Sequence, residues 1–113
     1  MKTNILSFSP QLATIELPSM MGEIDREAFR SQLILTLLDR TTSILLIDMK
    51  QVEFLDSAGL MVLISAYRLA IELDRRLSFC SVTPSVRMIF ELTQLDKKFE
   101  IFENRQAFDL SLA

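Results

Sequence analysis

The stretch that decides the fold is Ile44-Leu45-Leu46-Ile47-Asp48, followed after a short connection by Asp56-Ser57-Ala58-Gly59-Leu60. A continuous apolar run ended by an aspartate is typical of a strand that is buried on both faces of a parallel or mixed sheet. After the second segment, apolar residues recur at spacings of three and four, which predicts the buried stripe of an amphipathic helix. The residues of this predicted stripe are Leu60, Leu63, Ile64, Tyr67 and Ile71.

Upstream of this stretch, two short strands and a helix are expected. Residues 4–8 and 12–17 have the composition of strands, and Ser9-Pro10 between them is a turn signal. Asp25 is expected as the N-cap of a helix that ends near Arg40, because apolar residues follow it at helical spacing.

Downstream, the pattern continues with a strand over residues 77–82 and a helix that begins at Thr83-Pro84, with threonine as the cap and proline in the first turn. A last strand is expected over residues 99–103 and a closing helix over residues 106–112. Elements in this order predict an α/β fold in a single domain that spans residues 1–113. We expect a mixed β-sheet of about five strands packed with about four helices.

The composition excludes several classes of function. The chain has 113 residues, a formal net charge of −3, no histidine and a single cysteine, Cys80. Without histidine, Ser-His-Asp catalysis, Cys-His catalysis and histidine-ligated metals are excluded, and one cysteine cannot form an intrachain disulfide. Composition alone leaves open a carboxylate-only magnesium site or a pair of carboxylates in acid–base roles. We expect no enzymatic activity, no metal and no cofactor.

Charge and hydropathy also restrict the partners and the location. An acidic chain does not provide the positive surface that a nucleic acid or an anionic membrane requires. No apolar stretch is long enough to cross a bilayer, and the N-terminal residues lack the basic and then apolar pattern of a signal peptide. We therefore expect a cytoplasmic protein with protein partners, no direct contact with nucleic acid and no membrane association.

The signal for function lies around Ser57. This residue falls in or beside the first turn of the predicted helix, where unpaired N–H groups and the helix dipole stabilise a phosphate. Gly59 removes side-chain bulk next to the serine, which would let another protein approach closely. Met61 and Val62 flank the buried stripe and are expected to be at least partly exposed, as in a docking surface. On local chemistry alone, ordinary capping by Asp56 and Ser57 is the commoner explanation.

The chain resembles the anti-sigma factor antagonists of the STAS-domain family over nearly its whole length. The segment from Val52 to Leu60, read with the preceding Ile44 to Asp48, is similar to the most specific signature of that family. Gly22-Glu23-Ile24-Asp25 resembles the start of the family's first helix, and residues 86–102 resemble its third helix and last strand. The sequence departs from the family pattern at Pro18 to Met21, at Met61 and at Arg75-Arg76.

This resemblance implies a STAS-like fold and a specific switch. In such proteins the serine that matches Ser57 is phosphorylated by a partner that is both an anti-sigma factor and a serine kinase, and a serine phosphatase resets it. The unphosphorylated form binds that partner, which then releases its target. The expected partner-binding residues are Asp25, Asp56, Ser57, Ala58, Gly59, Leu60 and Met61. A monomer or weak dimer is expected, and plain helix capping is the alternative role for Asp25 and Asp56.

Three other functions are less well supported by the sequence. A receiver-like domain would be phosphorylated on Asp48, but its acidic pair after the first strand is replaced here by Ser7-Phe8-Ser9-Pro10. An unswitched interaction module of a larger signalling assembly would bind partners regardless of Ser57. An enzyme comes last, because no matched nucleophile and base are evident.

Overall fold

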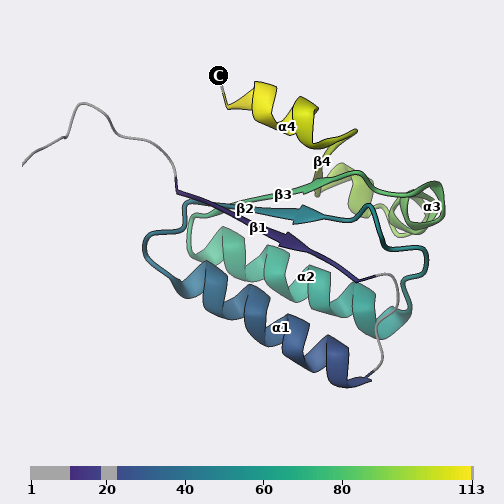
Figure 1. The fold of residues 1–113 in the computed structure, drawn as a ribbon. Helices are drawn as coiled ribbons and strands as arrows, with labels where there is room; N and C mark the ends of the chain where they lie inside the picture. The colour runs from purple at the N-terminus through teal and green to yellow at the C-terminus, as the bar shows by residue number, and fades with distance from the viewer. Residues whose placement is uncertain (1–10, 19–22, 113) are drawn as a thin grey trace, which may run out of the picture.

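The computed structural model describes residues 11–18 and 23–112, and these form a parallel sheet with helices on both faces (Figure 1). The elements follow one another as β1 (Leu12–Glu16), α1 (Glu23–Leu38), β2 (Ile44–Asp48), α2 (Ser57–Glu72), β3 (Arg76–Cys80), α3 (Pro84–Leu92), the 3₁₀ helix η2 (Leu95–Lys97), β4 (Glu100–Phe102) and α4 (Arg105–Ser111). The predicted α/β fold class is confirmed.

The sheet has the order β1-β2-β3-β4, and the three pairings between these strands are parallel. The predicted strand over residues 4–8 lies outside the described residues. The other predicted strands are present with small shifts at their ends. In the register, Ile44 of β2 lies opposite Leu12 of β1 and Arg76 of β3.

The apolar run of β2 is buried on both faces, as predicted. All four of its residues from Ile44 to Ile47 are buried. Because side chains alternate across a strand, Leu45 and Ile47 belong to one core cluster and Ile44 and Leu46 to another. One apolar segment therefore supplies the centre of both layers.

The two layers differ in size. The larger cluster includes residues of α1, α2 and α3, among them Leu33, Leu63 and Phe90. In Figure 1, α1 and α2 lie side by side on one face of the sheet, and α4 lies on the other. The smaller cluster consists of Ile44, Leu46, Cys80 and Phe108, with Leu12 and Phe102 packed against it.

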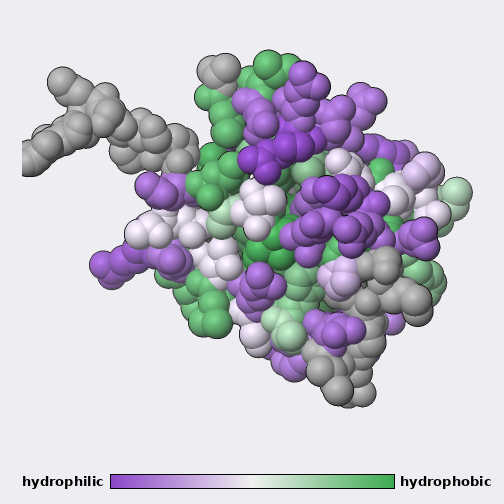
Figure 2. Space-filling model, in the orientation of Figure 1, coloured by the Kyte–Doolittle hydropathy of each residue, from purple (hydrophilic) through white to green (hydrophobic). Residues whose placement is uncertain are grey.

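The surface carries both hydrophilic and hydrophobic side chains. Figure 2 shows many hydrophilic residues on this face, with hydrophobic ones among them at the top, near α4, and at the lower left. Leu110 and Leu112 of this C-terminal region are exposed. No helix within residues 11–18 and 23–112 combines the length and the apolar character required to span a membrane.

Two details of the helices differ from the sequence prediction. Helix α1 begins at Glu23, so Asp25 lies in its first turn and is not its N-cap. A carboxylate in the first turn is still favoured by the helix dipole, which explains why the pattern resembled a cap. In α2 the buried residues are Gly59, Val62, Leu63, Ala66 and Ala70, whereas Ile71 is exposed. Val62 was expected to be partly exposed and is buried instead.

Candidate functional site

The start of α2 is built by Asp56, which is the N-cap of the helix. Its backbone is extended, with φ −87° and ψ 179°, and its Oδ1 accepts a hydrogen bond from the N–H of Gly59 at 2.7 Å. The backbone oxygen of Asp56 also accepts from the N–H of Leu60 at 2.9 Å. A side-chain oxygen in this position satisfies one of the otherwise unpaired N–H groups of the first turn. Asp56 therefore caps α2, which is one of the two roles expected for it.

Ser57 is the first residue of α2 and is exposed to solvent. Because Asp56 makes the cap, the helix does not depend on the Ser57 hydroxyl for its first turn. The residue lies at the positive end of the helix dipole, which favours a negative group attached there. An accessible hydroxyl in this environment is chemically suited to carry a phosphate.

The loop before Asp56 is held by the core on both sides. Val52 and Leu55 are buried, and the Val52 carbonyl accepts a hydrogen bond from the Thr83 hydroxyl at 2.9 Å. Phe54, between them, is 68% exposed. The loop is thus anchored at two points while it presents an aromatic ring two residues before the cap.

Helix α1 contributes a basic group to the same end of the molecule. The Arg26 Nη1 lies 3.4 Å from the Asp56 Oδ2, which links the first turn of α1 to the cap of α2. Both helices begin at the same end, beside the carboxyl end of β2 (Figure 1). In open α/β sheets this is the end where binding sites are commonly found.

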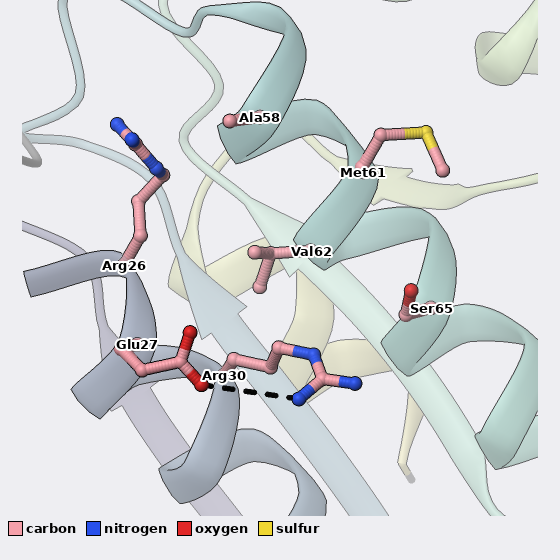
Figure 3. A pocket seen from close by; sticks show the side chains of 7 residues that line it. All are labelled: Arg26, Glu27, Arg30, Ala58, Met61, Val62 and Ser65. Carbon is pink, nitrogen blue, oxygen red and sulfur yellow. Dashed lines mark ion pairs between the residues drawn. The ribbon is translucent and has the colours of Figure 1, made fainter. Parts of the chain in front are cut away.

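A pocket of about 360 Å³ lies between the N-terminal parts of α1 and α2 (Figure 3). The α1 side carries charged groups, and the α2 side is mostly apolar. The Arg30 Nη1 lies 4.0 Å from the Glu27 Oε1, a weak pair within α1. The lining residues are Arg26, Glu27, Arg30, Ala58, Met61, Val62 and Ser65.

The residues predicted to bind a partner divide into an outer and an inner group. Asp25, Ser57 and Ala58 are exposed, and Met61 is 53% exposed. Asp56 and Leu60 are half-buried. Gly59 is buried, which contradicts the expectation that its missing side chain opens this position to another protein; its small size instead serves packing inside the molecule.

Sequence reasoning missed the basic wall of this pocket. Arg26 and Arg30 are four residues apart, so they lie on one face of α1. That spacing was available as a signal. The position of Arg26 beside Asp56 was not, because that contact joins residues that are 30 positions apart.

The carboxylate of Asp48, which would be the phosphoacceptor of a receiver-like domain, already makes contacts within its own loop. Its Oδ1 accepts a hydrogen bond from the N–H of Lys50 at 3.0 Å, and its Oδ2 lies 3.7 Å from the Lys50 Nζ. An aspartate that satisfies backbone N–H groups after a strand is ordinary loop chemistry. These contacts do not support a phosphoacceptor role for this residue.

Comparison with known proteins gives consistent results. The family model of the STAS domain matches residues 8–108. An anti-sigma F factor antagonist from Paenibacillus polymyxa is 26% identical over 88 residues, which cover 75% of each chain.

Solved structures show the same fold at low sequence identity. An anti-sigma-factor antagonist (STAS) domain protein from Planctomyces limnophilus has a TM-score of 0.79 and 22% identity, covering 90% of this chain and 91% of the other. The Bacillus cell fate determinant SpoIIAA in its phosphorylated form has a TM-score of 0.72 and 16% identity, covering 91% and 93%.

Proposed function

The chain belongs to the STAS domain family, and on this premise we propose that it is an anti-sigma factor antagonist whose partner binding is switched by phosphorylation of Ser57. The observation that carries the proposal is the exposed Ser57 at the start of α2, beside a cap that a different residue provides. The similarity to an anti-sigma F factor antagonist supports the class of partner. The phosphorylated SpoIIAA of the same fold supports this kind of switch.

In this proposal the unphosphorylated protein binds an anti-sigma factor that is also a serine kinase. The contact surface consists of the exposed residues around the start of α2, namely Ser57, Ala58 and Met61, with Asp25 from the first turn of α1. Asp56, Gly59 and Leu60 support this surface from below. Engagement of the partner releases the sigma factor that it had held.

The kinase partner then reverses the complex by phosphorylation. The Ser57 oxygen forms a bond to the γ-phosphorus of ATP, the bond between that phosphorus and the β–γ bridging oxygen breaks, ADP leaves, and the hydroxyl proton passes to a base of the kinase. ATP and magnesium belong to the partner. This chain acts as a cytoplasmic, non-enzymatic monomer or weak dimer.

The added phosphate opposes binding by its charge. Phosphorylation adds about −1.5 to −2 charges at neutral pH, and burying them in an interface built for a hydroxyl is unfavourable. Each 1.4 kcal/mol of penalty weakens binding about tenfold, so a penalty of a few kcal/mol is sufficient for a switch. A serine phosphatase restores the hydroxyl by transferring the phosphoryl group to water.

The test is a set of affinity captures from a lysate of the source organism, with wild type, Ser57→Ala and Ser57→Asp as baits. We expect a kinase-type regulator to be retained by wild type and Ser57→Ala and lost with Ser57→Asp. Ser85→Asp is the matched control, because Ser85 is also exposed in the first turn of a helix, α3, but does not line the pocket between α1 and α2. Retention of the same regulator by all four baits would reject the switch and favour an unswitched interaction module.

A further inference from the structure

The contact between Arg26 and Asp56 lies one residue from the Ser57 hydroxyl in the sequence. Asp56 uses its two carboxylate oxygens differently, since Oδ1 caps α2 and Oδ2 faces Arg26. The Arg26 pair is long for an ion pair, at 3.4 Å, and both side chains are partly exposed. Pairs of this kind contribute little to stability, so they are readily exchanged.

In sequence, Ser57 lies between two residues of this site. On one side is Asp56, which Arg26 contacts, and on the other is Ala58, which lines the same pocket as Arg26. Figure 3 shows the Arg26 side chain rising from α1 to the level of Ala58. A phosphate on Ser57 would therefore be attached one residue from a carboxylate that Arg26 already contacts.

From this geometry we infer that Arg26 is the internal counter-ion of phosphorylated Ser57, and that its guanidinium exchanges Asp56 for the phosphate when the serine is modified. A phosphate offers three acceptor oxygens and more negative charge than a carboxylate, and arginine binds it in a bidentate manner. Asp56 keeps its Oδ1 bond to the Gly59 N–H, so the cap of α2 survives the exchange. The exchange changes the charge pattern of the contact surface without a change of fold.

Arg30 provides a matched comparison within the same pocket. Its guanidinium extends further along α2, toward Ser65, and pairs weakly with Glu27 (Figure 3). Both arginines carry the same charge and lie on the same face of α1. Only Arg26 approaches the cap. Among the described residues, this end also carries Asp25 and Glu27 of α1, Glu53 of the loop before Asp56, and Lys50, which pairs with Asp48 and Glu16.

The inference rests on the proposed phosphorylation of Ser57, but its test does not require the kinase. Phosphoserine is installed at position 57 during translation by a suppressor tRNA system, and the titration of its phosphate is followed by phosphorus NMR. We expect Arg26→Gln to raise the second pKa of phosphoserine 57 by about half a unit, because an adjacent cation favours the dianion. Arg30→Gln should leave that pKa unchanged. Arg26→Lys should raise it by less than Arg26→Gln does, because lysine keeps the positive charge.

A second measurement keeps the inference testable even if Arg26→Gln folds poorly. In nitrogen-edited NMR spectra of the wild-type sequence, the side-chain Nε–H signal of Arg26 should shift between the Ser57 and phosphoserine 57 forms, while that of Arg30 should not. An unchanged Arg26 signal would overturn the inference. Equal effects of Arg26→Gln and Arg30→Gln on the phosphate pKa would overturn it too. Neither result would bear on whether a kinase modifies Ser57, which the captures above test separately.

Discussion

At the scale of single residues, the carboxylate of Glu100 in β4 accepts hydrogen bonds from two side chains of the neighbouring strand β3. It accepts hydrogen bonds from Arg76 through Nε at 2.8 Å and through Nη2 at 3.1 Å, and another from the hydroxyl of the fully buried Ser78. Burial alone would raise the pKa of the Glu100 carboxyl. The bonds from Arg76 and Ser78 outweigh burial, and the pKa lies below its usual range.

This lowered pKa predicts a stability difference that depends on pH. A carboxylate whose pKa is lower in the folded than in the unfolded state stabilises the fold above the unfolded value, and the contribution is lost as the pH falls through the folded value. Glu100→Gln should therefore lower the free energy of unfolding in urea at about pH 7, and the gap to wild type should narrow below about pH 4.5.

The exposed Glu103, in the turn after β4, provides the control for that experiment. Glu103→Gln should leave the free energy of unfolding close to the wild-type value, because exposed positions without special contacts contribute little. If the free energy of unfolding of Glu100→Gln differed from that of wild type by the same amount at every pH, the ionised form of Glu100 would make no specific contribution to stability.

At the scale of elements, α4 is a short helix that buries one aromatic ring in the core. Phe108 is its buried residue, and its ring lies 5.5 Å from that of Phe102 in an edge-to-face arrangement. The Arg76 guanidinium carbon lies 5.4 Å from the centre of the Phe108 ring. Helices this short are not stable alone in water, so this packing, together with the cap from Asn104 to the Ala107 N–H, keeps α4 in place.

Two truncations in α4 should separate packing from helix propensity. Phe108→Ala should lower the free energy of unfolding by about 3–5 kcal/mol, the usual loss for a buried aromatic ring. Leu110→Ala lies in the same helix, but Leu110 is 71% exposed, and its effect should stay within about 0.5 kcal/mol. Urea unfolding followed by circular dichroism measures both values. Similar losses for the two variants would mean that α4 is not anchored through Phe108.

At the scale of the whole molecule, the sheet is covered unequally. One face carries α1, α2 and α3, and the other carries the small cluster under α4. Cys80 belongs to the small cluster and is buried. Burial raises the pKa of its thiol, and the negative charge of Asp48 raises it further. Its reaction with a thiol reagent therefore requires this thinner layer to open.

Cys80 labelling should report how the two layers open. Native protein should react with a disulfide reagent much more slowly than urea-unfolded protein, which supplies the intrinsic rate. Phe108→Ala should accelerate the native reaction by roughly 100-fold, since about 3 kcal/mol corresponds to two factors of ten. Equal native rates for wild type and Phe108→Ala would place the opening elsewhere in the molecule.

The sequence was sufficient to predict β2 and the start of α2, because both depend on local patterns. It predicted the buried stripe of α2 one position too late, at Leu60, Leu63, Ile64, Tyr67 and Ile71 instead of Gly59, Val62, Leu63, Ala66 and Ala70. The side that packs most closely carries small residues, and a pattern of large apolar side chains does not mark it. Leu60, Ile64 and Tyr67 are partly buried at the edge of the core.

For the candidate site too, the features that depend on neighbouring positions were predictable from the sequence, and the contact between helices was not. Asp56 and Ser57 carry a local signal, since a capping residue and the first turn of a helix are properties of neighbouring positions. The spacing of Arg26 and Arg30 marks one face of α1, but it does not predict the contact of Arg26 with Asp56, which depends on how α1 lies against α2. Tertiary packing, which no spacing in the chain encodes, decides which charges meet at this end of the molecule.

The cap of α2 comes from Asp56 and not from the residue after it, and this separates two tasks that one side chain often performs. Asp56 stabilises the start of the helix, and Ser57 is left to carry the proposed modification. Position 57 is consequently an exposed attachment point, and replacing the serine with threonine, cysteine or a photoreactive amino acid should leave the cap bond between Asp56 and the Gly59 N–H intact. Whatever such a probe reports will describe the neighbours of the protein, not its folding.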